Sequence, residues 1–306
     1  MSEPVAAVDC GTNTVKLLVG SFVDGELDVA ARETRMVRLG QGVDRTGRLA
    51  DEALQRAFEA VDDYAAIVRD HGVPAERIRF CATSATRDAA NGADFTAGVR
   101  ERLGVTPEVL SGDEEAALSF DGAMRGLDGV PGWPALVVDV GGGSTEVVLG
   151  NRDGVRAARS MDVGSVRLHE RHVRHDPPRQ EELDAIARDV DGALDDCGVP
   201  LDEAATVVGV AGTCTTLGAA VLDLRTYDRD AIHGSVHDLG DVRDALRMVV
   251  GRTVDQRRAL PYMHPGRADV IDAGFVIVDR VLARTGVTSF TVSEADILEG
   301  IAWSLA

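Results

Sequence analysis

The chain lacks several features that would mark particular classes of protein. No apolar run in the 306 residues approaches the ~20 residues needed to cross a bilayer, so we expect no membrane association. The cysteines form no CxxC pair and have no histidines nearby at zinc spacing, and they stand at Cys10, Cys81, Cys197 and Cys214. We interpret them as reduced core residues. Zinc and copper are therefore disfavoured as cofactors.

Positive charge and aromatic residues are also scarce. The net charge is −19 and only 4% of the residues are aromatic. Nucleic-acid binding requires a positive surface and usually aromatic stacking platforms, so we expect no nucleic-acid partner. The same acidity would repel an anionic substrate. Backbone NH groups, a metal or local arginines must therefore reverse the potential at any anion-binding site.

The length and the N-terminal residues bear on domain number and location. At 306 residues the chain exceeds the usual size of one compact core, which favours two domains with a cleft between them. Met1 to Pro4 lead directly into an apolar strand, without the basic and apolar segments of a secretory signal. We therefore expect a cytoplasmic protein.

An internal repeat is the most informative feature of the sequence. Residues 5–20 read VAAVDCGTNTVKLLVG and residues 135–150 read ALVVDVGGGSTEVVLG, which align without gaps at an offset of 135 minus 5, or 130. Each segment is an apolar strand, an aspartate, a turn rich in glycine and hydroxyl residues, and a second apolar strand. This pattern predicts two β-hairpins in two related halves. Chance similarity of two strand-turn-strand units is the alternative.

Helical and strand patterns alternate through both halves, which predicts an α/β fold. We expect helices at 51–71, 113–124, 181–196 and 268–283, strands at 77–82, 106–110, 155–161, 206–211 and 288–292, and a last helix opening at Ser293. Glycine and proline concentrate in 126–134, typical of a linker. The predicted domains are residues 1–128 and 129–306, and the last helix could pack back on the first domain.

The two hairpin turns are candidate phosphate-binding loops. Their small side chains let backbone NH groups approach phosphoryl oxygens, and the hydroxyl groups add donors. The residues concerned are Gly11, Thr12, Asn13 and Thr14 in the first turn, and Gly141, Gly142, Gly143, Ser144 and Thr145 in the second. Neither turn has the lysine pattern of a P-loop. The alternative is that the glycines only permit a tight hairpin.

Acidic residues beside these turns are candidate metal ligands. Asp9, Asp139 and Glu146 supply the hard oxygen ligands that Mg²⁺ prefers, with Mn²⁺ as a second possibility. A strand-end aspartate can instead bond turn NH groups. Lys16 is the only lysine in the chain and occupies the repeat position of Glu146. It is a candidate for contact with a phosphate or a carboxylate, or else a solvated strand residue.

Two glutamates and two arginines complete the set. Ser111 and Glu114 have capping-box spacing, so Glu114 has a structural role, whereas Glu115 could orient and deprotonate an attacking water. From the spacing alone, Glu115 also fits a surface helix residue. Arg87 and Arg267 follow turn-rich segments, and their guanidinium groups suit phosphate oxygens. Surface ion pairs are the alternative for both.

Together these motifs resemble the exopolyphosphatase and guanosine pentaphosphate phosphatase family, a branch of the acetate kinase, sugar kinase, Hsp70 and actin superfamily. The resemblance covers nearly the whole chain. It rests on AVDCGTNTVKLLV at 7–19, ATSATRDAAN at 82–91, LSGDEEAALSFDGA at 110–123, VVDVGGGSTEVVLG at 137–150, MDVGSVRLHE at 161–170, GVAGTCTTLGA at 209–219, HPGRADVIDAG at 264–274 and VSEADILEGIAW at 292–303.

The resemblance implies two ribonuclease H-like domains of the actin-like ATPase type, an interdomain active-site cleft, and magnesium at the cleft floor. It implies that Glu115 is the general base, that Asp139 and Glu146 are metal-associated acids, and that Arg87 and Arg267 contact phosphate. The chain matches the short, two-domain form of the family.

The substrate implied is inorganic polyphosphate, with short chains favoured, or guanosine pentaphosphate. A kinase of the same superfamily and a non-catalytic guanosine pentaphosphate sensor are the alternatives. A homodimer is expected by analogy with relatives. The segment Thr213 to Thr216 matches the place where kinase relatives bind adenosine, and it leaves open whether a nucleotide binds there.

Overall fold

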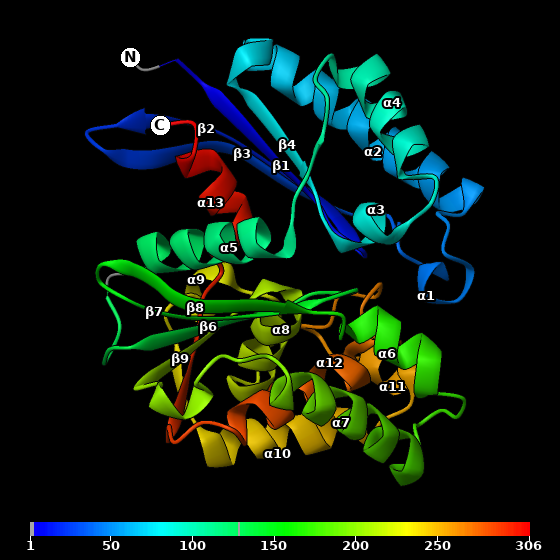
Figure 1. Ribbon diagram of the computed structural model, residues 1–306, viewed down its shortest axis with the longest axis vertical. Coiled ribbons are helices and arrows are strands. Elements are labelled where there is room, and N and C mark those ends of the chain that lie inside the picture. The colour runs from blue at the N-terminus through cyan, green and yellow to red at the C-terminus, as the bar shows by residue number, and fades with distance from the viewer. Residues whose placement is uncertain (1–2, 128) are drawn as a thin grey trace. The chain divides into compact units, whose positions relative to one another are not determined.

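The computed structural model describes residues 3–127 and 129–306, which form two compact units (Figure 1). The first unit comprises Met1–Gly122 and Ile297–Ala306, and the second comprises Ala123–Asp296. The expected domain boundary at residue 128 lies outside the described residues. The units divide between Gly122 and Ala123, inside helix α5 (Gly112–Gly126), and the last helix belongs to the first unit.

The first unit contains a five-stranded mixed sheet in the order β3-β2-β1-β4-β5. β1, β2 and β3 are antiparallel, whereas β4 and β5 continue parallel to β1. Besides α5, its elements are β1 (Val5–Cys10), β2 (Thr14–Val23), β3 (Glu26–Met36), α1 (Val43–Thr46), α2 (Asp51–Asp70), the 3₁₀ turn η1 (Ala75–Arg77), β4 (Ile78–Ala82), α3 (Ser84–Asp88), α4 (Gly92–Leu103), β5 (Glu108–Val109) and α13 (Ile297–Trp303).

The central strand of this sheet, β1, is buried on both faces, which explains its nearly continuous apolar sequence. Alternate residues point to opposite faces of a strand. Ala6 and Val8 therefore join the core under α2 and α4, whereas Ala7 packs with α13 on the other face. The apolar spacing predicted a helix over 51–71, and α2 confirms it at Asp51–Asp70.

The second unit contains a six-stranded mixed sheet in the order β10-β11-β9-β6-β7-β8. Its helices cover this sheet as Figure 1 shows. The elements are β6 (Ala135–Val140), β7 (Thr145–Asn151), β8 (Gly154–Met161), α6 (Ser165–His172), α7 (Gln180–Asp195), η2 (Leu201–Glu203), β9 (Thr206–Val210), α8 (Ala211–Val221), α9 (Arg229–Ile232), β10 (Val236–Asp238), α10 (Leu239–Val250), α11 (Val254–Arg258), α12 (Ile271–Leu282) and β11 (Ser289–Val292).

The internal repeat is visible in the strand pairing. The series β8-β7-β6-β9-β11 corresponds to β3-β2-β1-β4-β5 in neighbour order. Asp9 pairs with Lys16 and Asp139 pairs with Glu146, so the same register recurs at the repeat offset. The register shifts after Val19 in one unit and after Leu149 in the other, which again differ by 149 minus 19, or 130. The repeat therefore extends into the third strand.

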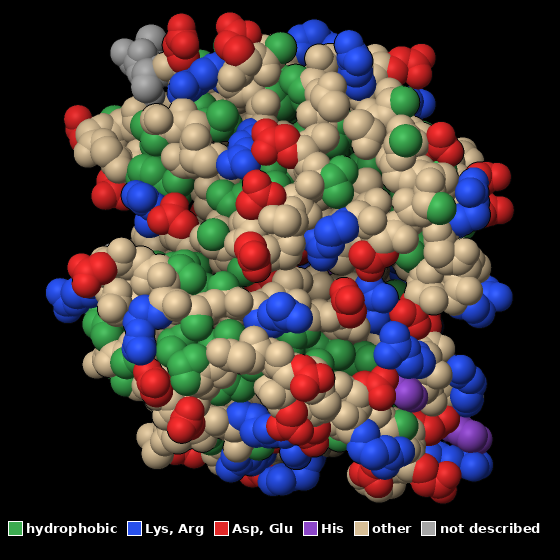
Figure 2. Space-filling view, in the orientation of Figure 1, with side chains coloured by type: hydrophobic (Ala, Val, Ile, Leu, Met, Phe, Trp, Pro, Cys, Tyr) green, Lys and Arg blue, Asp and Glu red, His purple; other side chains and the backbone are tan. Residues whose placement is uncertain are grey.

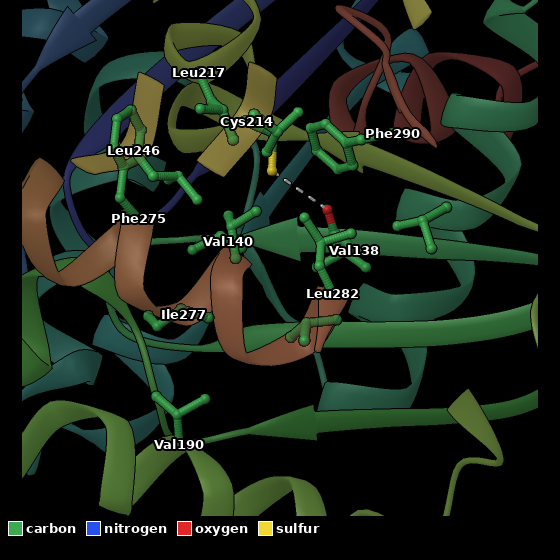
Figure 3. Packing of buried hydrophobic residues seen from close by; sticks show 14 of the residues in the cluster. Val138, Val140, Val190, Cys214, Leu217, Leu246, Phe275, Ile277, Leu282 and Phe290 are labelled. Carbon is green, nitrogen blue, oxygen red and sulfur yellow. Dashed lines mark hydrogen bonds between the residues drawn. The ribbon is translucent and has the colours of Figure 1, made fainter. Parts of the chain in front are cut away.

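The core of the second unit lies where α8 and α12 face β6 (Figure 3). Val138 and Val140 point from β6 into this core, and the Cys214 thiol of α8 lies 3.9 Å from the Val138 carbonyl oxygen. Side chains alternate along a strand. Asp139, between these two valines, therefore points to the opposite face, away from the apolar core.

Two predicted helix starts differ from the structure. The helix expected from residue 268 begins at Ile271, because residues 265–270 form turns in which the Arg267 carbonyl accepts hydrogen bonds from Val270 and Ile271. The prediction that Ser293 opens the last helix is wrong, since α13 begins at Ile297. The Ser293 amide instead bonds to the Gly209 carbonyl.

The surface carries charges of both signs. Acidic and basic side chains are interspersed over the face seen in Figure 2. Several form ion pairs, such as Arg35 with Asp63 at 3.2 Å, and exposed pairs of this kind contribute ~0–1 kcal/mol each. Among the described helices, none has the length and apolar character required to span a membrane.

The contact between α13 and α5 in the first unit requires a glycine. A Cβ atom at Gly300 would lie 2.0 Å from the Leu118 carbonyl oxygen, which is backbone and cannot rotate away. We predict that Gly300→Ala lowers the free energy of unfolding by about 1–3 kcal/mol. Chemical denaturation measures the change.

The matched control is Gly192→Ala in α7. Gly192 is an exposed helical glycine with no atom within 4 Å of an added Cβ, so this variant should be neutral or up to about 1 kcal/mol more stable. Equal unfolding midpoints for the two variants would contradict the assignment of close packing to Gly300.

Candidate active site

The first hairpin turn is fixed from behind through its carbonyl groups. The Gly11 amide donates to the Thr14 carbonyl at 2.9 Å and closes the turn. The Thr12 carbonyl accepts from the Gly40 amide at 2.8 Å, and the Asn13 carbonyl accepts from two amides that follow β3, at 3.0 Å each. A trans peptide places its N–H opposite its C=O. The amides of Asn13 and Thr14 therefore point away from the segment that follows β3.

The second hairpin turn repeats this arrangement. The Gly141 amide donates to the Ser144 carbonyl at 3.1 Å, the counterpart of the bond in the first turn. The first two amides of α6 donate to the carbonyls of Gly141 and Gly142 at 2.9 Å each. By the same peptide geometry, the amides of Gly142 and Gly143 point away from α6. Helix α6 thus holds the turn by its carbonyl groups, and the amides of the turn stay available on the side opposite α6.

Two further glycines permit these contacts. A Cβ atom at Gly40 would lie 2.3 Å from Thr12 Cγ2, and one at Gly164 would lie 2.5 Å from the Gly142 carbonyl oxygen. The segments that follow the third strand can approach the turns only because both positions lack a side chain. Sequence reasoning missed Gly40. A signal for it was present in the sequence, because an apolar residue followed by glycine stands shortly after the third strand in each half, at 39–40 and at 163–164.

The acidic residues beside the turns differ between the units. Asp9 pairs across the strands with Lys16, whose Nζ lies 3.4 Å from Asp9 Oδ2. In the second unit, Asp139 pairs in the same way with Glu146, so a carboxylate replaces the ammonium group. Glu146 Oε1 also accepts a hydrogen bond from the Ser160 hydroxyl at 2.6 Å. Lys16 is therefore placed on a carboxylate, one of the two contacts expected for it.

The paired carboxylates of the second unit suit a cation. Asp139 is 7% exposed and Glu146 is 2% exposed. Directly opposed residues of an antiparallel pair have Cβ atoms about 4.5–5.5 Å apart, so two buried negative charges repel unless a positive charge lies between them. Within residues 3–127 and 129–306 no three His, Cys, Asp or Glu side chains form a ready metal cage. Mg²⁺ fits, because it commonly uses one or two carboxylates together with water and phosphate oxygens.

Glu115 and Arg87 form an ion pair in the first unit. Arg87 Nη1 donates to Glu115 Oε2 at 3.0 Å and to the Leu110 carbonyl at 2.9 Å. Glu115 is only 7% exposed, which removes the alternative of a surface helix residue. The predicted capping box is present, since Glu114 accepts from the Ser111 amide at 2.9 Å.

The helix that carries Arg87 is tied to the first hairpin turn. Helix α3 follows β4, and the hydroxyl of its first residue, Ser84, lies 2.9 Å from the Thr12 hydroxyl. The Thr83 amide donates to the Cys10 carbonyl at 3.1 Å. The first turn, Arg87 and Glu115 are therefore held by one connected set of hydrogen bonds. Ser84 was missed by sequence reasoning, because its partner is distant along the chain.

Arg267 lies against the start of α8 in the second unit. A Cβ atom at Gly212 would lie 2.4 Å from the Arg267 Cζ, so the guanidinium rests on the Gly212 backbone. The Arg267 amide donates to the His264 carbonyl at 2.9 Å. Burial lowers the pKa of His264, and the Arg267 charge lowers it further. The imidazole is therefore neutral near pH 7, and Arg267 is the cation of this loop.

The cysteines beside the acidic residues are inert. All four cysteines are free and buried, which confirms their prediction as reduced core residues. Burial raises the pKa of Cys10 well above its usual value, and the Asp9 charge raises it further. Burial and the Asp139 charge likewise raise the pKa of Cys214. Neither thiol becomes a thiolate near neutral pH, so neither can act as a nucleophile.

Two units that share this sheet order and carry matching hairpin turns define an actin-like two-domain α/β fold, as predicted. The model for the Ppx/GppA phosphatase family matches residues 18–306, and the chain belongs to that family.

Relatives of known name are similar across most or part of the chain. Exopolyphosphatase 2 of Mycobacterium tuberculosis strain H37Rv is 47% identical over 317 residues, which cover 99% of this chain and 98% of the relative. The crystal structure of an exopolyphosphatase-like protein is 41% identical with a TM-score of 0.93, over 98% of both chains. A guanosine-5'-triphosphate,3'-diphosphate pyrophosphatase of Vibrio cholerae is 36% identical over 175 residues, which are 57% of this chain and 34% of the relative.

The support of the second turn by α6 is testable at Gly164. We predict that Gly164→Ala displaces the turn, because the added Cβ would meet the Gly142 carbonyl at 2.5 Å. The amides of Ser165 and Val166 would then lose their acceptors and exchange hydrogen about tenfold faster, the equivalent of one lost hydrogen bond. Hydrogen–deuterium exchange measures this. Wild-type protection in Gly164→Ala, matching that in Gly192→Ala, would show that α6 does not hold the turn.

Proposed function

We propose that the protein is an exopolyphosphatase, which hydrolyses the terminal phosphoanhydride bond of short inorganic polyphosphate chains and releases orthophosphate. The observation that carries the proposal is the hairpin turn of the second unit. Its amides point away from α6 beside the paired carboxylates of Asp139 and Glu146. The full-length similarity to a relative named Exopolyphosphatase 2 supports the same substrate.

The turns and arginines would hold the terminal phosphoryl group. Backbone amides of the turns donate hydrogen bonds to its oxygens, and the guanidinium groups of Arg87 and Arg267 stabilise the charge that develops on the phosphoanhydride. Both contributions supply local positive potential in a chain of net charge −19. Catalysis then comes chiefly from positioning and electrostatics.

Glu115 would act on the attacking water. Its carboxylate is held by the Arg87 guanidinium at 3.0 Å, which fixes its direction. Glu115 accepts a hydrogen bond from the water, whose oxygen attacks the terminal phosphorus as the bond from phosphorus to the bridging oxygen breaks. The water oxygen forms the new P–O bond, and one of its protons passes to Glu115 and from there to the solvent. The products are orthophosphate and a chain one phosphate shorter.

Asp139 and Glu146 would hold Mg²⁺. When bound, the ion neutralises charge on the phosphate oxygens. The Ser160 hydroxyl fixes the Glu146 carboxylate by its 2.6 Å hydrogen bond. The prediction that Asp9 also belongs to the metal shell remains a prediction. Lys16 already gives Asp9 a positive neighbour at 3.4 Å, so the need for a metal is smaller there.

Guanosine pentaphosphate is the second candidate substrate. Its terminal phosphoanhydride presents the same chemical group to the turns and to Glu115. The similarity to the Vibrio cholerae guanosine-5'-triphosphate,3'-diphosphate pyrophosphatase, over 57% of this chain, favours it specifically. A phosphate-release assay tests both candidates. It uses short polyphosphate, long polyphosphate and guanosine pentaphosphate as substrates, each in the presence of magnesium and in the presence of a chelator. Release from none of them would reject the proposed function.

We predict that Glu115→Gln keeps the fold and the binding of polyphosphate but lowers kcat by about 100- to 10,000-fold. Glutamine retains an oxygen that can accept from Arg87 but cannot accept the water proton. The matched control is Glu114→Gln on the same helix. Glu114 accepts hydrogen bonds from Ser111, and its side chain is exposed. This control should keep kcat within a few-fold of wild type, and equal losses in both variants would contradict the role of Glu115.

We predict that Asp139→Asn and Glu146→Gln each raise the magnesium concentration needed for half-maximal activity by at least about tenfold, because each removes one anionic ligand. A magnesium titration of phosphate release gives the value. Asp153→Asn, in the exposed turn between β7 and β8, is the matched control. Asp9→Asn tests the remaining predicted ligand. Unchanged titrations for Asp139→Asn and Glu146→Gln would remove both from the metal shell.

A further inference from the structure

Three charged or titratable side chains form a hydrogen-bonded chain within the second unit. Arg257 Nη1 donates to Asp272 Oδ2 at 2.8 Å, and the other oxygen, Oδ1, lies 3.0 Å from His169 Nδ1. Arg257 is 0% exposed and Asp272 is 1% exposed. Although burial opposes ionisation, hydrogen bonding from His169 and the charges of His169 and Arg257 lower the pKa of Asp272. Asp272 is therefore ionised near neutral pH and forms an ion pair with Arg257.

One end of this chain reaches the support of the second hairpin turn. His169 lies on α6, the helix whose first amides bond to the carbonyls of Gly141 and Gly142. On the same helix, Arg167 Nε donates to the Gly143 carbonyl at 2.7 Å. The position of α6 therefore sets the position of the turn. The His169–Asp272 bond fixes α6 against α12, on which Asp272 is the second residue.

The other end of the chain reaches the loop that carries Arg267. Arg257 Nη1 also donates to the carbonyl of Ala268, the neighbour of Arg267, at 3.3 Å. Its Nε and Nη2 donate to the carbonyls of Val249 and Val250 at 3.1 and 2.9 Å, which caps the C-terminal end of α10. All three guanidinium nitrogens are thus used. Arg257 fixes the Arg267 loop relative to α10 and α12.

We propose that Arg257, Asp272 and His169 are positioning residues that set the second hairpin turn and Arg267 at a fixed separation. This inference deepens the proposed function, since it assumes that these two elements bind the same phosphoryl group. A buried ion pair is weak evidence for stability, because apolar residues of similar volume often serve as well. Directed hydrogen bonds, however, fix the relative position of two separate elements better than apolar packing does.

His169 provides the cleanest variants, because it is the most exposed member of the chain. His169→Leu removes the donor to Asp272 at similar volume, whereas His169→Asn places an amide nitrogen near the position of Nδ1 and should restore the bond. The matched control is His172→Leu on the same helix. His172 makes an equivalent bond, 2.8 Å to Asp189, and has a similar side-chain exposure of 19% against 22% for His169.

Steady-state kinetics on short polyphosphate tests the proposal. We expect His169→Leu to raise KM or lower kcat so that kcat/KM falls by about tenfold or more, the size of one lost hydrogen bond to a charged group. His169→Asn should recover most of the loss, and His172→Leu should match wild type. Equal losses in His169→Leu and His172→Leu, or no recovery in His169→Asn, would overturn the positioning role.

Hydrogen–deuterium exchange separates this inference from the proposed function. In His169→Leu, the amides of 165–167 should exchange about tenfold faster than in His172→Leu, whether or not the protein hydrolyses polyphosphate. Arg257→Lys should loosen 267–271 as well, since lysine cannot make all the bonds of the guanidinium. Wild-type exchange of 165–167 in a folded His169→Leu, or of 267–271 in a folded Arg257→Lys, would overturn the network even if activity were lost. A wild-type protein inactive on every phosphoanhydride would reject the function alone.

Discussion

The candidate site depends on hydrogen bonds to the carbonyl groups of the two hairpin turns. In each unit these bonds come from the chain segment that follows the third strand. Amides of that segment bond to the carbonyls of Thr12 and Asn13 in one unit and of Gly141 and Gly142 in the other. Because a trans peptide is planar, the N–H group of each of these peptides points in the opposite direction to its bonded carbonyl. A chain of net charge −19 thus gains a local surface of N–H dipoles, which needs no cationic side chain. The acidity of the whole molecule and the binding of a polyanion are compatible for this reason.

The two halves share a backbone but differ in charge at one position. Lys16 and Glu146 occupy the same register beside Asp9 and Asp139. The first half pairs its aspartate with a lysine, whereas the second places another buried carboxylate opposite its own. The two copies of the hairpin thus carry different charge pairs through a single difference in residue type. The metal site that we propose rests on the second pair.

Much of this could be predicted where the signal is local. The gapless repeat predicted both hairpins and their matching register, and cap spacing separated the structural Glu114 from Glu115. Contacts between distant segments carried no such signal: His169 and Asp272 are 103 residues apart. Ser84 was missed for the same reason, whereas Gly40 was missed although an apolar residue followed by glycine recurs after the third strand of each half. The late start of α12 reflects turn hydrogen bonds to the Arg267 carbonyl, and that of α13 reflects the bond from the Ser293 amide to the distant Gly209 carbonyl. Both override the local helical pattern.

The pairing of Glu115 with Arg87 bears on the role that we propose for Glu115. A carboxylate that already accepts a hydrogen bond at 3.0 Å from a guanidinium has one oxygen committed and a fixed plane. Such a group directs a water molecule well. Phosphoryl transfer relies on positioning and electrostatics more than on covalent chemistry. In the proposed mechanism the geometry of Glu115, set by Arg87 and by the capped first turn of α5, therefore matters together with its ability to accept the water proton.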